Sequence, residues 1–559
     1  MTHVVTQACC ADASCVVACP VNCIHPAPGE PGFAEAEMLY VDPAGCVDCG
    51  ACVTACPVGA IQPHTSLTPA QEPFAELNAS YFDVFAHEDR TPLALVPRQR
   101  RIRAAGPFRV AVIGAGPAGL YTADELLRHP EVVVDVFDRL PTPHGLVRAG
   151  VAPDHPSTRG VQDLFAAIEG QPGFRYVLGV EYGADVDLGW LRDRYHAVIL
   201  ATGASADRRL AIPGEDLPGS LSATQVVGWY NAHPDLASLD VPLNHERVVL
   251  VGNGNVALDV ARILAQPAEL LESTDIADHA LAALRDSRVR EVVVLGRRGP
   301  AEAAYTLPEL VGLLGLAQTG AFDVEVDLGG APLPEDQRGD VLRDLAALPT
   351  DPARRRIVLR FLTQPVRLLG EGRVTGVEVT RTRLVETEGR VIAEPTDERE
   401  VIEAGLVLRS VGYRALPVPE LPFDESSHTV PHTDGRVRPG VYVSGWLKRG
   451  PQGFIGTNKS CAQETVSSLL DDLDAGDVPT PGRSAAELER DLRRLDHVDL
   501  SGWRAIDREE RRRGAAQGRP RVRFTDTDSP RGLSRTASRS RRAYPAGKPG
   551  RTPVLQSRT

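Results

Sequence analysis

The sequence contains almost no cysteine outside one short block, and that block contains no basic residue. Nine of the ten cysteines lie between Cys9 and Cys56, and the tenth is Cys461. Residues 1–89 carry eleven Asp and Glu side chains but no Lys or Arg. The long cysteine-free stretch that follows, with no sign of secretion, disfavours a disulfide scaffold. Dense cysteine in one block of such a chain indicates metal binding instead.

Long hydrophobic runs are also missing. No apolar stretch approaches the ~18 residues that a membrane span needs, and the first residues have neither the basic start nor the apolar core of a secretion signal. We therefore expect a cytoplasmic protein with no membrane span and no nucleic-acid partner. Hydrophobic residues make up 42% and charged residues 24% of the 559 residues, which excludes a wholly disordered or fibrous chain. At roughly 150 residues per domain, this length predicts three to four domains.

The second half of the cysteine block is a complete iron–sulfur motif. Cys46, Cys49, Cys52 and Cys56 form a C-x2-C-x2-C-x3-C-P run. In such a run three closely spaced thiolates hold one cluster, and the fourth cysteine ligates the other cluster of a two-cluster protein. This spacing disfavours the alternative of a structural zinc site.

The first half of the block is the same motif with one ligand replaced. Counting back from Cys19 gives Cys15, Asp12 and Cys9, so the run reads C-x2-D-x2-C-x3-C-P. A carboxylate is a poorer ligand than a thiolate for an iron–sulfur corner. Two outcomes stay open: the corner is empty and the cluster is [3Fe-4S], or Asp12 ligates a fourth iron weakly.

The last cysteine of each run is expected to ligate the cluster held by the other run, and this assigns the cysteines to two clusters. A [4Fe-4S] cluster is expected on Cys19, Cys46, Cys49 and Cys52, and the site beside Asp12 on Cys9, Cys15 and Cys56. Over about its first 66 residues the chain resembles bacterial ferredoxins of the seven-iron type. We expect Cys10 and Cys23 not to be ligands. The acidic character of the block favours docking to basic redox partners, with simple solubility as the alternative.

A first glycine-rich turn follows the strand expected at 108–113. Gly114, Gly116 and Gly119 form a GxGxxG turn, in which the glycines allow the tight turn, the approach of a pyrophosphate and close packing of helix on strand. The helix N-terminus offers its N–H groups to the phosphates. Asp138 lies 19 residues after Gly119, where an acid binds a ribose hydroxyl. The GxGPAG variant resembles FAD sites more than NAD sites.

A second glycine-rich turn, GxGxxA, begins at Gly252 after the strand expected at 248–251. The next strand has no acid at its end and is followed directly by Arg297 and Arg298. Guanidinium groups at this place suit a 2′-phosphate, so the pattern predicts NADPH rather than NADH.

These turns, the arginine pair and the segments 141–156 and 450–459 together resemble adrenodoxin-reductase-type ferredoxin–NADP reductases over roughly residues 107–510. With the cysteine block in front, the chain resembles the fused ferredoxin/ferredoxin–NADP reductases of mycobacteria. The resemblance implies an α/β fold with two doubly wound three-layer dinucleotide-binding domains, for FAD and NADP, preceded by a small α+β ferredoxin-like iron–sulfur domain. The expected segments are a ferredoxin-type domain at 1–66, a linker at 67–106, an FAD-binding domain at 107–205 and 410–510, an NADPH-binding domain at 206–409, and a largely disordered Arg/Ser-rich tail at 511–559.

The resemblance also implies cofactor contacts, residue by residue. For FAD they are Gly114, Gly116, Ala118, Gly119, Asp138, Leu146, Tyr182, Trp446, Gly453, Phe454 and Ile455. For NADPH they are Asn253, Gly254, Asn255, Val256, Arg297, Arg298, Glu309 and Gly453. His155 matches a histidine beside the flavin and is the candidate catalytic residue, with a purely structural histidine as the alternative; its acidic partner is not assigned.

The implied reaction moves a hydride from NADPH to FAD and then single electrons to the clusters and on to a downstream redox protein, such as a ferredoxin or a P450. One alternative is the electron-input subunit of a larger complex, like the small subunit of glutamate synthase. A simple electron carrier is another, although it would not need Arg297 and Arg298. A disulfide reductase is disfavoured because Cys461 has no second cysteine near it in the sequence.

Overall fold

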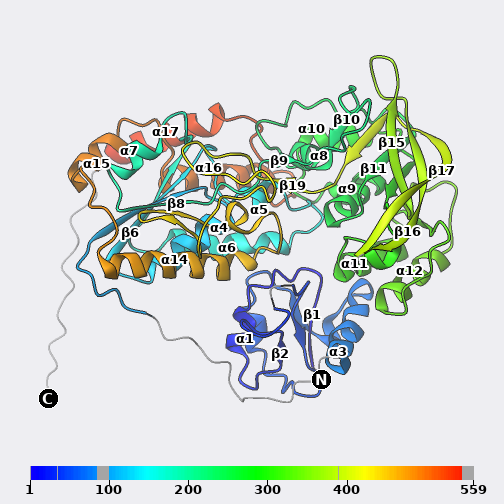
Figure 1. Ribbon diagram of the computed structural model, residues 1–559, viewed down its shortest axis with the longest axis horizontal. Coiled ribbons are helices and arrows are strands. Elements are labelled where there is room, and N and C mark those ends of the chain that lie inside the picture. The colour runs from blue at the N-terminus through cyan, green and yellow to red at the C-terminus, as the bar shows by residue number, and fades with distance from the viewer. Residues whose placement is uncertain (1, 34, 85–99, 388–389, 544–559) are drawn as a thin grey trace.

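The computed structural model describes residues 2–33, 35–84, 100–387 and 390–543. These residues form a small N-terminal unit and two larger α/β units, each built on its own six-stranded sheet. Figure 1 shows the N-terminal unit, in dark blue, lying against both larger units at the place where they meet. No helix in the described part of the chain is both long and apolar enough to cross a membrane.

The N-terminal unit is built from two short antiparallel strand pairs and three helices. The pairs are β1 (His3–Val5) with β4 (Ile61–Pro63) and β2 (Ile24–His25) with β3 (Tyr40–Val41); the helices are α1 (Ser14–Ala18), α2 (Ala51–Ala55) and α3 (Pro73–Val84). Asn78 of α3 accepts hydrogen bonds from the backbone N–H groups of Val5 at 3.1 Å and Val41 at 3.0 Å. The unit therefore extends to residue 84 and includes part of the segment expected to be a linker.

The first α/β unit has the sheet order β20-β21-β8-β5-β6-β7, parallel except for the edge strand β20. Its strands are β5 (Phe108–Ile113), β6 (Val132–Asp138), β7 (Phe174–Leu178), β8 (Ala197–Leu200), β20 (Arg436–Arg438) and β21 (Val441–Val443). Val110 and Val112 pack into one core, and Ala111 and Ile113 into a second core on the opposite face. Because both faces are covered, the inner strands are mostly apolar, with Ala197–Leu200 and Val441–Val443 wholly so.

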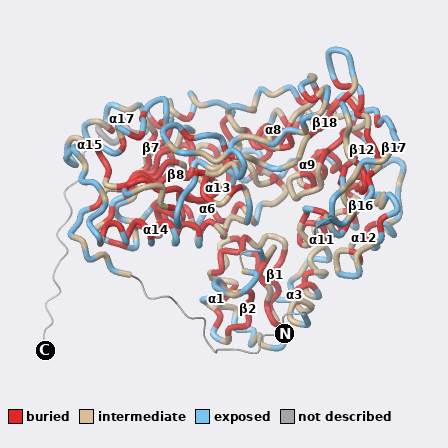
Figure 2. Tube along the Cα trace, viewed as in Figure 1, coloured by how far each residue is buried: buried red, intermediate tan, exposed pale blue. Residues whose placement is uncertain are grey.

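Helices flank this sheet and carry most of the site. They are α4 (Pro117–Leu127), α5 (Gly145–Ala149), α6 (Val161–Glu169), α7 (Leu188–Arg192), α13 (Trp446–Arg449), α14 (Thr457–Ala475), α15 (Ala485–Leu492) and α16 (Leu500–Ala515). The core that contains α4, α6 and α14 continues without interruption into the N-terminal unit. Figure 2 shows the buried positions concentrated along the strands and at this junction.

The second α/β unit has an all-parallel sheet in the order β10-β18-β11-β12-β14-β13. Its strands are β10 (Ser220–Ser222), β11 (Arg247–Val251), β12 (Glu291–Leu295), β13 (Asp323–Asp327), β14 (Arg356–Arg360) and β18 (Leu406–Arg409). Its helices are α8 (Ala223–Tyr230), α9 (Asn255–Ala265), α10 (Asp278–Arg285), α11 (Leu307–Gln318) and α12 (Gln337–Ala347). An antiparallel sheet of β15 (Thr363–Leu369), β16 (Gly376–Thr387) and β17 (Arg390–Glu403) packs at one side, and β9 (Ala206–Asp207) pairs with β19 (Tyr413–Arg414) where the chain crosses between the units.

The segment after residue 511 differs from the disordered tail that its composition suggests. Helix α16 continues to Ala515, the chain then passes between the two larger units, and α17 (Asp528–Ala543) follows. Arg519, Arg521 and Arg523 are buried. These alternating arginines point into the interface between the two larger units, where they pair with acidic side chains. Composition alone does not reveal such pairs. Residues 544–559 of the expected tail, and residues 85–99 of the expected linker, lie outside the described residues.

Candidate functional site

The first glycine-rich turn connects β5 to α4 and is held tightly by its glycines. A Cβ at Gly114 would lie 2.4 Å from the carbonyl oxygen of Ala201, and one at Gly119 would lie 1.8 Å from that of Gly114. A Cβ at Gly116 would have no neighbour closer than 3.9 Å. Gly114 and Gly119 therefore have no room for a side chain. Gly116 faces open space in front of the N-terminus of α4. This cradle fits a pyrophosphate.

Asp138 ends β6 beside this turn. Its carboxylate accepts hydrogen bonds from the N–H groups of Ala115 at 2.8 Å and Leu140 at 2.9 Å. Burial raises the pKa of Asp138, and these two hydrogen bonds act against that rise. A pocket opens next to it, lined by residues of 138–149, by residues 231–234 and by Phe524 and Asp526. The carboxylate therefore faces a recess with room for a polar ligand group.

The second glycine-rich turn connects β11 to α9 in the same way. A Cβ at Gly252 would lie 2.2 Å from the carbonyl oxygen of Ser410, whereas one at Gly254 would meet nothing closer than 3.9 Å. Asn253 lies beside Gly296, and Asn255 accepts from the N–H of Thr306 at 2.8 Å. Gly254 therefore leaves open space at the start of α9, an eleven-residue helix, as Gly116 does at the start of α4. Val256 is half-buried in the first turn of that helix.

Arg297 and Arg298 follow β12 at the same end of this sheet. Their backbone is fixed, because the carbonyl of Arg297 accepts from Thr382 at 2.7 Å and that of Arg298 from the N–H of Leu362 at 3.2 Å. Arg297 is exposed and Arg298 half-buried. Among the residues that the structure describes, neither guanidinium forms an ion pair. Two unneutralised cations at this position fit a phosphate group.

The late loop 445–459 packs against the start of α4. A Cβ at Gly445 would lie 2.5 Å from that of Ala118, and the indole of Trp446 donates to the carbonyl of Gln452 at 3.2 Å. Gly453 has a positive φ of 81°, which favours glycine, and the N–H of Phe454 donates to Thr457 at 2.9 Å. The structure thus brings the expected loop to the first cradle.

The other expected FAD residues lie on separate segments. Leu146 stands 40% exposed at the start of α5, which adjoins the turn because Gly145 approaches Gly116. Ile455 is partly buried against the shared core. The hydroxyl of Tyr182 donates to the carbonyl of Pro419 at 2.9 Å, so the tyrosine side chain is occupied by a contact within the protein.

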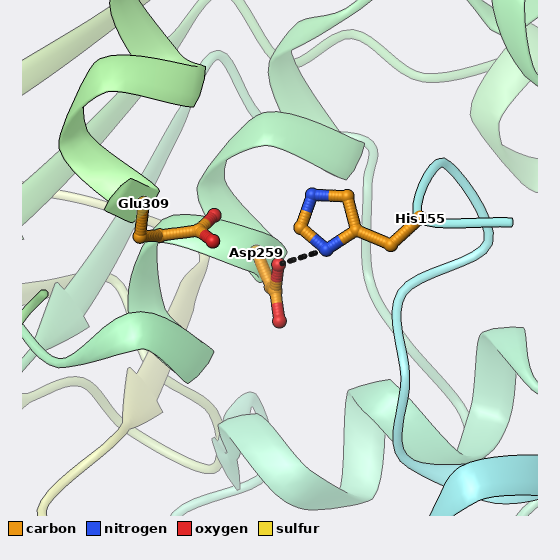
Figure 3. Close-up of side chains that lie close together, drawn as sticks. All are labelled: His155, Asp259 and Glu309. Atoms are coloured by element: carbon orange, nitrogen blue, oxygen red, sulfur yellow. Dashed lines mark ion pairs between the residues drawn. The ribbon is translucent and has the colours of Figure 1, made fainter. Parts of the chain in front are cut away.

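His155 lies between the two α/β units, opposite acids of the second unit. Figure 3 shows it pointing toward Asp259 of α9, with Glu309 of α11 beyond. The distance from His155 Nδ1 to Asp259 Oδ1 is 3.8 Å. Burial, followed by the charge of Glu309, raises the pKa of Asp259 to about 6. Asp259 is the acidic neighbour that the sequence left unassigned.

A buried arginine organises these acids. Arg262 of α9 is fully buried and pairs with Asp259 at 2.6 Å, with Glu309 at 2.5 Å and with Asp154 of the first unit at 2.6 Å. Burial alone would raise the pKa of Asp154, but the positive charge of Arg262 brings it down to about 2. His155, Asp259 and Glu309 offer ligand atoms within 4.8 Å of one another. Because Arg262 already occupies both carboxylates, the group is a hydrogen-bonded charge cluster rather than a cation site.

The cysteines of the N-terminal unit gather at two places, and none of the ten cysteines of the chain forms a disulfide. One pocket is lined by Cys19, Cys46, Cys49, Cys52 and Cys23. The hydrogen bond between the sulfurs of Cys23 and Cys19, 3.4 Å apart, lowers the pKa of Cys19 to about 5. This donor set fits an iron–sulfur cluster ligated by Cys19, Cys46, Cys49 and Cys52. Cys23 is then a hydrogen-bonding neighbour of the cluster.

The remaining cysteines surround Asp12. Cys15 lies within electrostatic reach of Cys9, Asp12 and Cys56. Asp12 faces the first α/β unit, because its carbonyl accepts a hydrogen bond from Lys459 at 3.2 Å. Burial, with added repulsion from Cys56 and Asp12, raises the pKa of Cys9 to about 11. Burial also raises the pKa of Cys15, and an iron–sulfur cluster binds cysteine as the thiolate. We call Cys9, Cys15 and Cys56 the proximal site, and Cys19, Cys46, Cys49 and Cys52 the distal site.

The N-terminal unit contacts both halves of this site. The N–H of Gly456 donates to the carbonyl of Cys10 at 2.8 Å, and Gln7 donates to Glu309 at 3.1 Å. Glu37 accepts from the N–H of Leu307, which begins α11, at 2.8 Å. Sequence reasoning missed these contacts. It also missed the cluster that Asp154, Asp259 and Arg262 form. Only Asp259 carried a signal, because it belongs to the first helical turns after the second glycine motif.

Comparison with known proteins identifies relatives along nearly the whole chain. Residues 39–62 match the family described as "4Fe-4S binding domain", and residues 108–295 match "Pyridine nucleotide-disulphide oxidoreductase". The chain is 49% identical over 563 residues to the "Probable ferredoxin/ferredoxin--NADP reductase" of Mycobacterium tuberculosis, covering 94% of each chain. It is 48% identical over 552 residues to the protein of the same name in Mycobacterium leprae, covering 94% of this chain and 96% of the relative.

A solved structure is similar to the two α/β units. The "Mycobacterium tuberculosis FprA in complex with NADPH" superimposes with a TM-score of 0.73 at 42% identity, covering 77% of this chain and 99% of the other. These findings confirm the predicted fold class, with an iron–sulfur unit in front of a dinucleotide-binding flavoprotein. They also confirm the resemblance on which the expected function rests.

Proposed function

This chain belongs to the family of fused ferredoxin/ferredoxin–NADP reductases, and from that membership we propose that it catalyses the ferredoxin–NADP+ reductase reaction with its own ferredoxin unit as the first electron acceptor. It is an oxidoreductase with a flavoprotein part and an iron–sulfur part. NADPH is the electron source in this proposal, and a separate one-electron redox protein is the destination.

One observation carries the proposal: the ferredoxin unit is docked on the loop that approaches the first cradle. The hydrogen bond from Gly456 to Cys10 follows directly on the loop 453–455. An uninterrupted apolar core joins the two units at this place. A carrier that only stored electrons would not need its clusters held against a dinucleotide site.

The residues around the first cradle are proposed to hold FAD. The open position at Gly116 and the N-terminus of α4 receive the pyrophosphate, and Asp138 binds a ribose hydroxyl. The loop of Trp446 and Gly453–Ile455 would contact the flavin. FAD, when bound, supplies the conversion between a two-electron hydride donor and one-electron acceptors.

The second cradle is proposed to hold NADPH. Gly254 and the N-terminus of α9 receive the pyrophosphate, and Arg297 with Arg298 binds the 2′-phosphate that distinguishes NADPH from NADH. His155 lies where the two units meet and is positioned by Asp259. Its imidazole orients the reacting groups, and hydride transfer itself requires no proton at this position.

The two cysteine groups are proposed to hold different clusters. The distal site offers four thiolates for a [4Fe-4S] cluster, whereas the proximal site offers three and holds a [3Fe-4S] cluster. The carboxylate of Asp12 supports the second assignment, because it accepts hydrogen bonds from the N–H of Ser14 at 3.2 Å and from the Ser14 hydroxyl. These contacts compete with a bond to iron.

Flavin and iron analysis combined with steady-state kinetics tests the proposal. The purified chain should contain one FAD and both clusters, and it should reduce cytochrome c with NADPH much faster than with NADH. A chain that binds flavin but reduces no one-electron acceptor with either nucleotide would contradict it. An equal rate with NADH would contradict the assignment of the arginine pair alone.

A further inference from the structure

We propose that electrons reach the ferredoxin unit at the proximal site and leave it from the distal site. We also propose that Lys459 is the positioning residue that holds the proximal site against the loop 453–456. The inference rests on the proposed function and adds a direction and a docking residue to it. NADPH gives up two electrons and is converted to NADP+ and a proton. Two molecules of an external one-electron acceptor are each reduced once, through the two clusters.

The proximal site is seated on the reductase by direct backbone contact. Besides the hydrogen bond from Gly456 to Cys10, a Cβ at Gly456 would lie 2.3 Å from the backbone of Ala11 and Asp12. No side chain therefore separates the cysteine loop from the reductase loop here. Gly456 directly follows Gly453–Ile455, so the first cluster site adjoins the proposed flavin loop. Electron-transfer rates fall steeply with distance, which favours this site as the first acceptor.

Lys459 supplies the positive charge at this contact. Its ammonium donates to the carbonyl of Asp12 at 3.2 Å and to the hydroxyl of Ser14 at 3.4 Å, and it lies 3.9 Å from the Asp12 carboxylate. Residues 1–89 contain no Lys or Arg, so a lysine or arginine beside this site has to come from later in the chain. Lys459 is one of only three lysines in the chain.

A positive charge at this position has two physical consequences. It attracts the acidic ferredoxin unit to the correct face of the reductase. It also stabilises the reduced cluster relative to the oxidised one, because reduction adds a negative charge next to the ammonium. Both effects favour transfer from the flavin side into the proximal site.

The distal site opens to solvent. The residues that line its pocket all belong to residues 3–52, so no described residue of the reductase part lines it. Cys49 is exposed, and the neighbouring Val47 is 59% exposed. An exposed ligand beside an exposed apolar side chain is suited to brief contact with a redox protein. We infer that the loop Cys46–Gly50 is the surface from which electrons depart.

The substitution Lys459→Gln in the holoenzyme tests the docking residue. Glu35→Gln is the control, since it likewise removes one charge, from an exposed acid of the ferredoxin unit. Stopped-flow absorption separates flavin reduction by NADPH from the later cluster reduction. In Lys459→Gln flavin reduction should keep its rate, and cluster reduction should slow about fivefold. Glu35→Gln should change neither rate.

A redox titration followed by electron paramagnetic resonance gives a readout that does not depend on turnover. Lys459→Gln should lower the midpoint potential of the proximal cluster and leave that of the distal cluster unchanged. An unchanged proximal potential together with a wild-type rate of cluster reduction would overturn the role of Lys459. A shift at the distal cluster instead would overturn the order of the two sites.

The exposed valine tests the departure surface. Val47→Arg places a positive charge on the loop Cys46–Gly50 and should slow reduction of cytochrome c, a basic protein, about fivefold. Internal cluster reduction should keep its wild-type rate. Unaltered cytochrome c reduction would overturn the assignment of this surface. Failure of NADPH to reduce the flavin in the wild-type protein would contradict the proposed function instead, so the two failures are distinguishable.

Discussion

Arg262, in the second α/β unit, donates a hydrogen bond from its Nε to the Asp154 carboxylate of the first unit at 2.6 Å. The two residues are 108 positions apart in the sequence, and the guanidinium is fully buried. The same guanidinium also holds Asp259 and Glu309. This contact therefore ties the position of α9, the helix of the proposed NADPH site, to the loop that carries His155.

Asp154→Asn should loosen this connection between the two units. The amide keeps an oxygen that accepts from Arg262, but the charge that compensates the buried guanidinium is lost. We expect the free energy of unfolding to fall by about 1–3 kcal/mol, measured by urea denaturation with flavin release as the signal. Asp351→Asn, which removes an ion pair on an exposed surface, should change it by less than ~0.5 kcal/mol. Equal effects of the two variants would contradict a special role for Asp154.

The raised pKa of Asp259 predicts a pH dependence of flavin reduction by NADPH. Burial and the charge of Glu309 raise this pKa to about 6, so the carboxyl is neutral below that pH and ionised above it. Loss of hydride leaves a positive charge on the nicotinamide ring, which an ionised carboxylate stabilises. The rate should therefore rise with pH through about 6 and then level off.

Stopped-flow measurements from pH ~5 to pH ~8 check this sign. Asp259→Asn should be slow and insensitive to pH in this range. Asp154→Asn should move the inflection to lower pH, because the charge of Asp154 contributes to the raised pKa. A wild-type rate that falls as pH rises would refute the role of the ionised carboxylate.

Arg297→Ala should reduce the preference for NADPH over NADH. The side chain has no ion-pair partner among the described residues, so its removal costs no internal contact, and the loss is that of one charge-assisted hydrogen bond to the 2′-phosphate. We expect kcat/KM for NADPH to fall by roughly 10- to 100-fold, with NADH little affected. Arg373→Ala, at an exposed position of the same unit, should leave both constants unchanged. A parallel loss with both nucleotides would indicate a folding defect.

The sequence predicted those parts of the site that are encoded by motifs of a few neighbouring residues. The glycine turns, the cysteine runs and the arginine pair each lie within a few residues of the strand or helix that positions them, so spacing alone carries the prediction. Lys459 and Asp12 are 447 residues apart, and Arg262 reaches acids from three segments. Contacts of this kind depend on how the units dock, which no local pattern encodes.

The segment 519–524 shows the same limit for the fold. Its composition is that of a solvated tail, yet Arg523 donates to Asp275 at 2.5 Å and to the carbonyl of Asn231 at 3.0 Å. Its guanidinium also bonds the carbonyl of Arg148 in the first unit. Arginine is favourable in such a seam only because Asp275 is present there, and the pKa of that acid is kept below its usual range by Arg523 and Arg159 against the effect of burial.

Arg523→Met should destabilise the protein by removing this bridge between the two α/β units. The loss should be smaller than the roughly 3–5 kcal/mol typical of a broken buried ion pair, because Arg159 still compensates Asp275. Urea denaturation of the holoenzyme measures it. Arg535→Met is the control, since Arg535 and its partner Asp496 are both exposed, and it should have little effect. A wild-type midpoint for Arg523→Met would contradict a bridging role for the segment.

Asp12→Cys should convert the proximal site from a [3Fe-4S] to a [4Fe-4S] cluster. The wild-type carboxylate is engaged by Ser14 and lies 3.9 Å from Lys459, whereas a thiolate at this position completes the four-cysteine motif. The oxidised wild-type protein should show a three-iron signal in electron paramagnetic resonance, and the variant should lose it while iron rises from about seven to about eight atoms per chain. Asp12→Ser, which shortens the side chain without adding a thiolate, should keep the signal. Absence of the signal in the wild-type protein, with eight irons already bound, would show instead that Asp12 ligates the fourth iron.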